Sequence, residues 1–245
     1  MPPALFKVVR PLGAMQVFDE RPGEQLPCAP AFVRGRGRFA TFRAAAGQEV
    51  RIKFVVATIG ARTFDATRNL VIHPRGEDEV VAKIEPPRSA KPEIRTFVAP
   101  RTGFYDIYYD TAYNGVAIKS SNVPVALDAT ERAVPLVGVV GTCGRWLAAA
   151  KECLMIYAPR RSRVECNVSC TGGECVSLAL YNPSGKRECW IPTVEGIGRC
   201  QAEADVDGFW GIRIGEPEYG AFEDHHLGVR GVPGWIFLCQ GRYWK

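Results

Sequence analysis

Residues 99–109 of this chain read APRTGFYDIYY, and residues 204–214 read ADVDGFWGIRI. Each stretch is a turn that ends in glycine, followed by a strand of alternating aromatic and aliphatic residues. Gly208 lies 105 residues after Gly103, which is about the length of one small domain. The recurrence therefore predicts a small domain that is present in two copies.

Two shorter blocks recur in the same order along the chain. Residues 51–56 (RIKFVV) match residues 163–168 (RVECNV), and residues 71–76 (VIHPRG) match residues 180–185 (LYNPSG). Three blocks that recur in one order, each aligned at a turn and a strand, are unlike a chance resemblance. They extend the repeat over most of both halves.

Short apolar strands and turns of Pro or Gly alternate throughout the chain, and no stretch shows sustained helical spacing of apolar residues. The fold class is therefore predicted to be all-β, with two tandem antiparallel β-sandwich domains of jelly-roll type. We expect the first domain to span residues 1–130. The second, a cysteine-rich repeat of the first, is expected to span residues 131–245.

The repeat also assigns the two faces of the recurring strand. One face is apolar in both copies and is predicted to lie in the core; its residues are Tyr105, Ile107 and Tyr109 in the first copy and Trp210, Ile212 and Ile214 in the second. The other face is mixed and is predicted to point to solvent or to a partner; in the first copy it consists of Phe104, Asp106 and Tyr108.

The composition is that of a globular protein, with 47% hydrophobic and 23% charged residues. No run of about 18 apolar residues is present, so we expect no membrane insertion. Residues 1–10 lack the apolar core of a signal peptide. A net charge of +5 is too small to indicate a nucleic-acid partner.

Cysteine is concentrated in the second half, and only Cys28 lies in the first. An even, dense set indicates disulfides and an extracellular or periplasmic location, whereas the alternative is a set of buried thiols used as small apolar residues. The spacing is not the paired C-x2-C form of common zinc sites, so no cofactor is expected. The candidate disulfide residues are Cys143, Cys153, Cys166, Cys170, Cys175, Cys189, Cys200 and Cys239.

The sequence shows no catalytic constellation. His73 is predicted to lie in a turn, where Asn182 is its counterpart in the second copy, so hydrogen bonding in a turn explains both residues. Neither a Gly-x-Ser-x-Gly elbow nor a phosphate-binding loop occurs. We therefore do not expect an enzyme.

One local cluster contains residue types that bind metals: Asp224, His225 and His226, preceded by Glu223. It is predicted to lie in a long loop. Adjacent histidines on an extended chain point apart, so both rarely bind the same ion. A solvated loop is the favoured interpretation, and metal binding is the alternative.

The order of a strand, a Pro/Gly turn and a later Gly-aromatic strand resembles the bacterial pre-peptidase C-terminal family of jelly-roll modules. Residues 69–76 with 102–105 carry this resemblance in one half, and residues 178–185 with 207–210 carry it in the other. The family usually has an Asp before the first of these strands, and this chain has Asn69 there in the first copy. The resemblance implies an extracytoplasmic, non-catalytic accessory module.

Sugar binding requires exposed planar aromatic rings, because the C–H groups of a pyranose stack on a ring face. The candidates are Tyr108, Tyr113, Trp190 and Trp235, with Tyr219 and Phe222 in addition. Core packing is the alternative for each of them. The favoured function is binding of a polysaccharide or a cell-surface component by a secreted module. An architectural spacer without a ligand is the second hypothesis, and a hydrolase-associated enzyme domain is the third.

Overall fold

A computed structural model describes residues 15–29, 31–58, 69–110, 114–137, 153–170, 172, 174–215, 224–239 and 241–244. These ranges contain strands and turns and no helix, and all the strand pairs in them are antiparallel. The predicted all-β fold class is confirmed.

The strands share the short, alternating composition from which they were predicted. In chain order they are β1 (Val17–Asp19), β2 (Leu26–Pro27), β3 (Arg36–Ala44), β4 (Glu49–Thr58), β5 (Leu70–Pro74), β6 (Ala82–Ile84), β7 (Glu93–Val98), β8 (Gly103–Asp110), β9 (Asn114–Ser121), β10 (Val125–Asp128), β11 (Val134–Val137), β12 (Leu154–Ala158), β13 (Arg163–Cys170), β14 (Cys175–Tyr181), β15 (Arg187–Glu195), β16 (Ile197–Glu203), β17 (Gly208–Gly215), β18 (Asp224–Arg230), β19 (Trp235–Phe237) and β20 (Arg242–Trp244).

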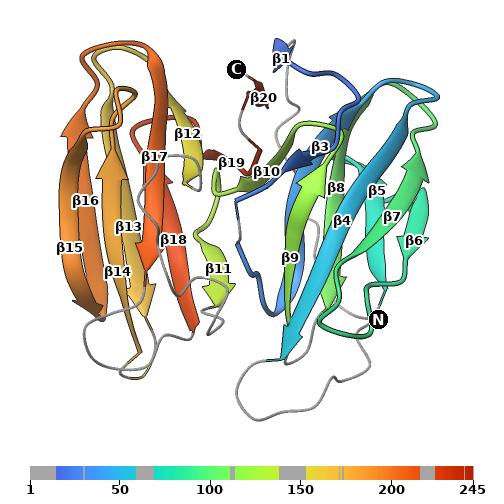
Figure 1. The fold of residues 1–245 in the computed structure, drawn as a ribbon, viewed down its shortest axis with the longest axis horizontal. Coiled ribbons are helices and arrows are strands. Elements are labelled where there is room, and N and C mark those ends of the chain that lie inside the picture. Colours follow the sequence, from blue (N-terminus) through green and yellow to red (C-terminus); the bar gives the residue numbers. More distant parts are fainter. Residues whose placement is uncertain are drawn as a thin grey trace.

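One long sheet runs through both halves of the molecule, in the strand order β15-β14-β17-β12-β19-β10-β3-β8-β5-β6. Two four-stranded sheets, β11-β18-β13-β16 and β2-β9-β4-β7, accompany its two ends (Figure 1). The strand orders of the halves correspond one to one when β10 is matched with β19, β3 with β12, β8 with β17, β5 with β14 and β6 with β15. The predicted domain boundary falls between β10 and β11 and stays a prediction.

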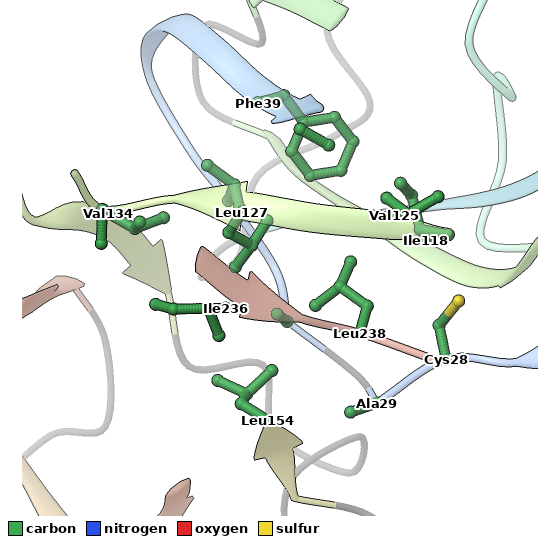
Figure 2. Packing of buried hydrophobic residues seen from close by; sticks show 14 of the residues in the cluster. Cys28, Ala29, Phe39, Ile118, Val125, Leu127, Val134, Leu154, Ile236 and Leu238 are labelled. Carbon is green, nitrogen blue, oxygen red and sulfur yellow. The ribbon is translucent and has the colours of Figure 1, made fainter. Parts of the chain in front are cut away.

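The halves meet where β10 and β19 pair at the middle of the long sheet. Buried side chains from both halves pack together there, and Figure 2 shows Leu127, Val134, Leu154 and Ile236 around this junction. Burial of one such side chain contributes about 1.5–3 kcal/mol. The halves therefore share one continuous apolar core.

The predicted core face of the recurring strand is confirmed. Its six residues, Tyr105, Ile107, Tyr109, Trp210, Ile212 and Ile214, are all buried. The opposite face differs from the prediction, because Asp106 is only 1% exposed and Phe104 packs edge-on against Trp244 at 5.1 Å between ring centroids. The reason is that β20 returns to pair with β1, and its aromatic side chains cover this part of the long sheet.

A disulfide joins the segment after β2 to the segment after β19. Cys28, the one cysteine of the first half, is not among the candidate disulfide residues, but it is bonded to Cys239, and their Cα atoms lie 4.4 Å apart. Next to it, the backbone N–H of Ala29 donates a hydrogen bond to the carbonyl of Leu238 at 2.8 Å. The segment after β19 is thereby attached to the first half.

The registers of β5 and β14 correct the predicted alignment by one residue. His73 lies opposite Asp106 of β8, and Tyr181 lies opposite Gly211 of β17. Because Gly211 is the repeat counterpart of Asp106, the structural counterpart of His73 is Tyr181 and not Asn182. A shift of one residue moves a side chain to the other face of a sheet. His73 is thus a buried strand residue, 6% exposed, and does not lie in a turn.

Candidate functional site

The four aromatic residues expected to bind sugar lie in different environments. Trp190 is 49% exposed, whereas Trp235 is 3% exposed because it packs against Trp244. Tyr108 is half-buried; its ring meets His73 edge-on, and burial raises the pKa of its hydroxyl. Of these three, Trp190 alone presents its ring to solvent. Tyr113 lies outside the described residues, as do Tyr219 and Phe222.

An open hollow of about 190 Å³ surrounds Trp190 at one end of the long sheet. Its lining comes from β14, β15 and β17, which are neighbours in the sheet, with β15 at the edge. The lining residues are Ser177, Ala179, Tyr181, Arg187, Trp190, Arg213 and Gly215.

The alternation of β14 explains how this surface forms. Val176, Leu178 and Leu180 point into the core and are buried, so the residues between them face the other side of the sheet. Ala179 lies opposite Trp190 on β15 and opposite Arg213 on β17. Cross-strand partners share a face, so the indole and the guanidinium stand on either side of a small alanine.

Cross-strand pairing also places Tyr181 and its partners on the face of the sheet that carries the hollow. Tyr181 lies opposite Arg187 on β15 and opposite Gly211 on β17. The guanidinium carbon of Arg187 lies over the ring of Trp190, 4.9 Å from its centroid. Such a contact attracts the cation to the aromatic face and restricts the rotation of both side chains. The hollow therefore combines an exposed aromatic ring with two cations, a phenol and a serine hydroxyl.

A disulfide fixes the edge strand that carries Trp190. Cys189 of β15 is bonded to Cys200 of β16, so it connects the long sheet to the four-stranded sheet beneath it. The Cα atoms lie 5.6 Å apart, and Cys189 is the residue directly before Trp190. The disulfide therefore restricts the backbone of the edge strand next to Trp190.

Replacement of both Cys189 and Cys200 by alanine is expected to reduce the free energy of unfolding by about 3 kcal/mol. The bond closes a loop with a sequence separation of 11 residues, and cross-links of that length restrict the unfolded chain by this amount. Urea denaturation of the oxidised wild type and the double variant measures the difference. Equal midpoints would contradict the prediction.

The remaining candidate cysteines are mostly buried. Cys166 is a free thiol whose pKa is raised by burial, and it lies in the core, as does Phe54, its counterpart in the matching blocks 51–56 and 163–168. Burial also raises the pKa of the Cys170 thiol, to about 11. Cys153 and Cys175 are buried as well, and Cys143 lies outside the described residues. The disulfide interpretation therefore holds for Cys189, Cys200 and Cys239, and the buried-thiol interpretation holds for Cys166.

The expected metal-ligand cluster is a strand and not a loop. Asp224, His225 and His226 begin β18, which pairs with β11 and β13. His225 is 2% exposed and His226 is half-exposed, as expected for neighbours on opposite faces. Asp224 forms an ion pair with Arg34 at 2.8 Å. In the described part of the chain, no group of three or more metal-binding side chains comes together.

A buried charged cluster in the first half was not predicted. Arg75 donates hydrogen bonds at 2.8 Å to both Asp106 and Asp128, and Arg38 lies 3.0 Å from Asp128. Burial raises the pKa of Asp106, since Arg75 and its other partners offset the cost only in part. Burial also opposes ionisation of Asp128, but Arg38, Thr130 and Arg75 outweigh it and lower its pKa.

This cluster lies on the face of the long sheet that carries the hollow in the second half, but it is centred on β3, β8 and β10, whereas the hollow lies over β14, β15 and β17. Asp106 corresponds to Gly211, and Tyr108 corresponds to Arg213. Arg75 also covers a face of Trp235, with its guanidinium carbon 4.8 Å from the ring centroid. In the second half, Cys153 and Tyr181 lie against Gly211 at the position that Asp106 holds in the first half, and the hollow lies beside it, around Arg213 and Trp190.

The comparisons with known proteins identify no relative by sequence. No family model matches this chain. No curated protein matches it either.

No helix in the described ranges has the length and apolar character needed to span a membrane.

Among solved structures, the chain is similar to the M60 catalytic domain with the CBM51-1 and CBM51-2 domains from Clostridium perfringens ZmpB, at 5% identity and a TM-score of 0.26. The similarity covers 94% of this chain and 38% of that one. It is also similar to an f-lectin (fucolectin) from Morone saxatilis (striped bass) serum, at 8% identity and a TM-score of 0.21, over 84% of this chain and 78% of that one. Neither is a pre-peptidase C-terminal module, and the resemblance to that family stays a prediction.

Proposed function

We propose that this chain is a non-catalytic, extracytoplasmic β-sandwich module that binds carbohydrate through the hollow around Trp190. The observation that carries the proposal is the exposed indole in a hollow that also contains hydrogen-bonding side chains. A sugar ring stacks its C–H groups on such a face, while Ser177 and Tyr181 offer hydroxyls to its own hydroxyls. Sites of this mixed character are typical of small-ligand recognition.

Two further features support the location and the non-catalytic role. The disulfides Cys28–Cys239 and Cys189–Cys200 are typical of proteins from oxidising compartments. Among the described residues that line the hollow there is no carboxylate, histidine or cysteine, and these are the side chains that general acid–base and covalent catalysis most often use. A binding role therefore fits the hollow better than a hydrolytic one.

Replacement of Trp190 by alanine is expected to weaken glycan binding at least about tenfold, equivalent to about 1.4 kcal/mol. The indole supplies the stacking surface, and its half-exposed position makes the variant fold like the wild type. A glycan array screened with both proteins, followed by titration of the best ligand, measures the loss.

The matched control is Ile197→Ala, which removes a side chain that is 77% exposed and does not line the hollow. This control is expected to bind like the wild type. If the wild type binds no polysaccharide class, the proposal is contradicted. That result would favour the hypothesis of an architectural spacer without a ligand. Undiminished binding by Trp190→Ala would place the binding surface elsewhere.

A further inference from the structure

We infer that Asn167 accepts an N-linked oligosaccharide when the chain enters a secretory compartment that contains an oligosaccharyltransferase. Residues 167–169 read Asn-Val-Ser, which is the acceptor pattern Asn-x-Ser/Thr with a residue other than proline in the middle. The inference rests on the extracytoplasmic location in the proposed function and does not depend on the hollow around Trp190. It assigns a modification site to the four-stranded sheet of the second half, which lies across the core from the hollow.

The side chain of Asn167 points away from the core. Its neighbours on β13, Cys166 and Val168, are 0% exposed, and successive side chains of a strand point to opposite faces of the sheet. Asn167 and Ser169 therefore lie on the outer face. Ile197 of β16 lies opposite Ser169 and is 77% exposed, so this face of the sheet is open to solvent.

The cross-strand neighbours leave room for a sugar at Asn167. On one side the neighbour is Gly228 of β18, which has no side chain; a Cβ there would lie 2.6 Å from Oδ1 of Asn167. On the other side it is Arg199 of β16, whose side chain is 56% exposed and whose Nε lies 3.3 Å from the carboxylate of Glu165. The asparagine amide therefore occupies the space that glycine leaves, and no bulky side chain stands opposite it on β18.

The amide nitrogen of Asn167 is the atom that reacts, and it is accessible in the structure. The amide oxygen is buried and has no hydrogen-bond partner among the described residues, whereas Nδ2 donates no hydrogen bond to them and is in contact with solvent. In the transfer, Nδ2 forms a bond to C1 of the first sugar of a lipid diphosphate-linked oligosaccharide. The bond from C1 to the diphosphate oxygen breaks, the lipid diphosphate leaves with the bonding electrons, and one amide proton is released to solvent.

The pairing of β13 sets the order of modification and folding. Asn167 and Ser169 each have a partner on both β16 and β18, so the backbone of the acceptor is enclosed in the sheet once the chain has folded. The transferase can reach this segment only before β13 pairs. Secretion of the chain, and not incubation of the folded protein with the transferase, is therefore the appropriate test.

The chain contains an internal control for the acceptor pattern. Residues 182–184 read Asn-Pro-Ser, and proline in the middle position prevents transfer. Asn182 lies in a turn, where its Oδ1 accepts hydrogen bonds from the backbone N–H groups of Ser184 and Lys186, each at 3.0 Å. The other three asparagines of the chain lack Ser or Thr two positions later. One glycan is therefore expected, and not two.

The experiment is secretion of the full chain, behind a secretion signal, from yeast or mammalian cells. Electrophoresis before and after treatment with peptide N-glycosidase measures the number of glycans, and mass spectrometry of tryptic peptide 164–186 detects the conversion of Asn167 to aspartate. The wild type is expected to lose the mass of one glycan. Asn167→Gln and Ser169→Ala are expected to lose the glycan completely, and the serine variant leaves the contact with Gly228 intact.

The matched controls change the second asparagine. Asn182→Gln is expected to keep the wild-type glycan, and Pro183→Ala, which completes the pattern at Asn182, is expected to gain a second one. A secreted wild type without a glycan would overturn the inference, and so would a glycan that persists in Asn167→Gln. The proposed function is tested separately: a glycosylated chain that binds no array glycan would contradict that function and leave this inference standing, and an unmodified chain that binds would do the reverse.

Discussion

Replacement of Cys28 and Cys239 by alanine is expected to lower the free energy of unfolding by about 5 kcal/mol. The two cysteines are 211 residues apart in sequence, so their bond restricts nearly the whole unfolded chain. The entropic stabilisation by a cross-link grows with the logarithm of the loop it closes, which gives about this value. The melting temperature should fall by roughly 10 °C or more for a chain of this length.

The Cys189/Cys200 double variant is the matched comparison, because it removes the same two sulfur atoms from a loop with a separation of only 11 residues. Thermal unfolding of the oxidised wild type and of both double variants gives the order of stability. The Cys28/Cys239 variant should be the least stable of the three. Peptide mapping without reduction should show Cys28 linked to Cys239, and a Cys28 that is recovered as a free thiol would contradict the structure.

This long-range bond also shows where prediction from sequence ends. The cysteine count predicts disulfides, but the pairing of Cys28 with Cys239 depends on β19, a strand from near the end of the chain that lies between β10 and β12. Nothing local to Cys28 indicates that placement. Cysteines close in sequence are as ambiguous, since Cys189 pairs with Cys200 whereas Cys166 remains a thiol.

The core was predictable for the opposite reason. Alternation within one strand decides which residues face inward, and the second copy tests each assignment, as with Tyr105 and Trp210. The sequence alignment of β5 with β14 differs from the structural one by one residue. It superimposes the Pro and Gly of the turn that follows each strand, and the strands themselves align one residue earlier in β14. Loop residues tolerate changes in length, whereas the hydrogen-bonded register of Tyr181 does not.

The candidate site was predictable only in part. An exposed aromatic ring is a reasonable expectation for a sugar-binding surface, and Trp190 meets it. Its neighbours Ser177 and Arg213 come from strands that the sequence alone does not place beside β15. Trp235 could not be distinguished from Trp190 by residue type, because its burial depends on the return of β20.

The buried charged cluster leads to the second large effect. Replacement of Arg75 by methionine, which has a similar length and no charge, is expected to cost about 3–5 kcal/mol of stability. The side chain of Arg75 is 6% exposed, and those of Asp106 and Asp128 are 1% exposed, so its loss leaves two buried carboxylates with Arg38 as their remaining cation. When one partner of a buried ion pair is removed, the desolvation cost of the other charge is no longer compensated, and the folded state is destabilised.

Arg101→Met is the matched control, because Arg101 also pairs with a carboxylate, Glu77, but on the surface. Water screens such a pair, and its loss is expected to leave the unfolding midpoint nearly unchanged. Urea denaturation of the wild type and of both variants at pH 7 measures the difference. Similar midpoints for Arg75→Met and Arg101→Met would show that the cluster contributes no more than a surface pair.

The pH dependence tests whether the loss is electrostatic. In the wild type the lowered pKa of Asp128 contributes stability above its unfolded pKa of about 4, and this contribution is lost as the pH falls. Without Arg75, the pKa of Asp106, already raised by burial, should rise further, so the folded variant takes up protons before the unfolded chain does. The stability deficit of Arg75→Met should therefore be largest at pH 7 and shrink towards pH 4. A deficit that is the same at both pH values would assign the loss to packing against Trp235 and not to charge.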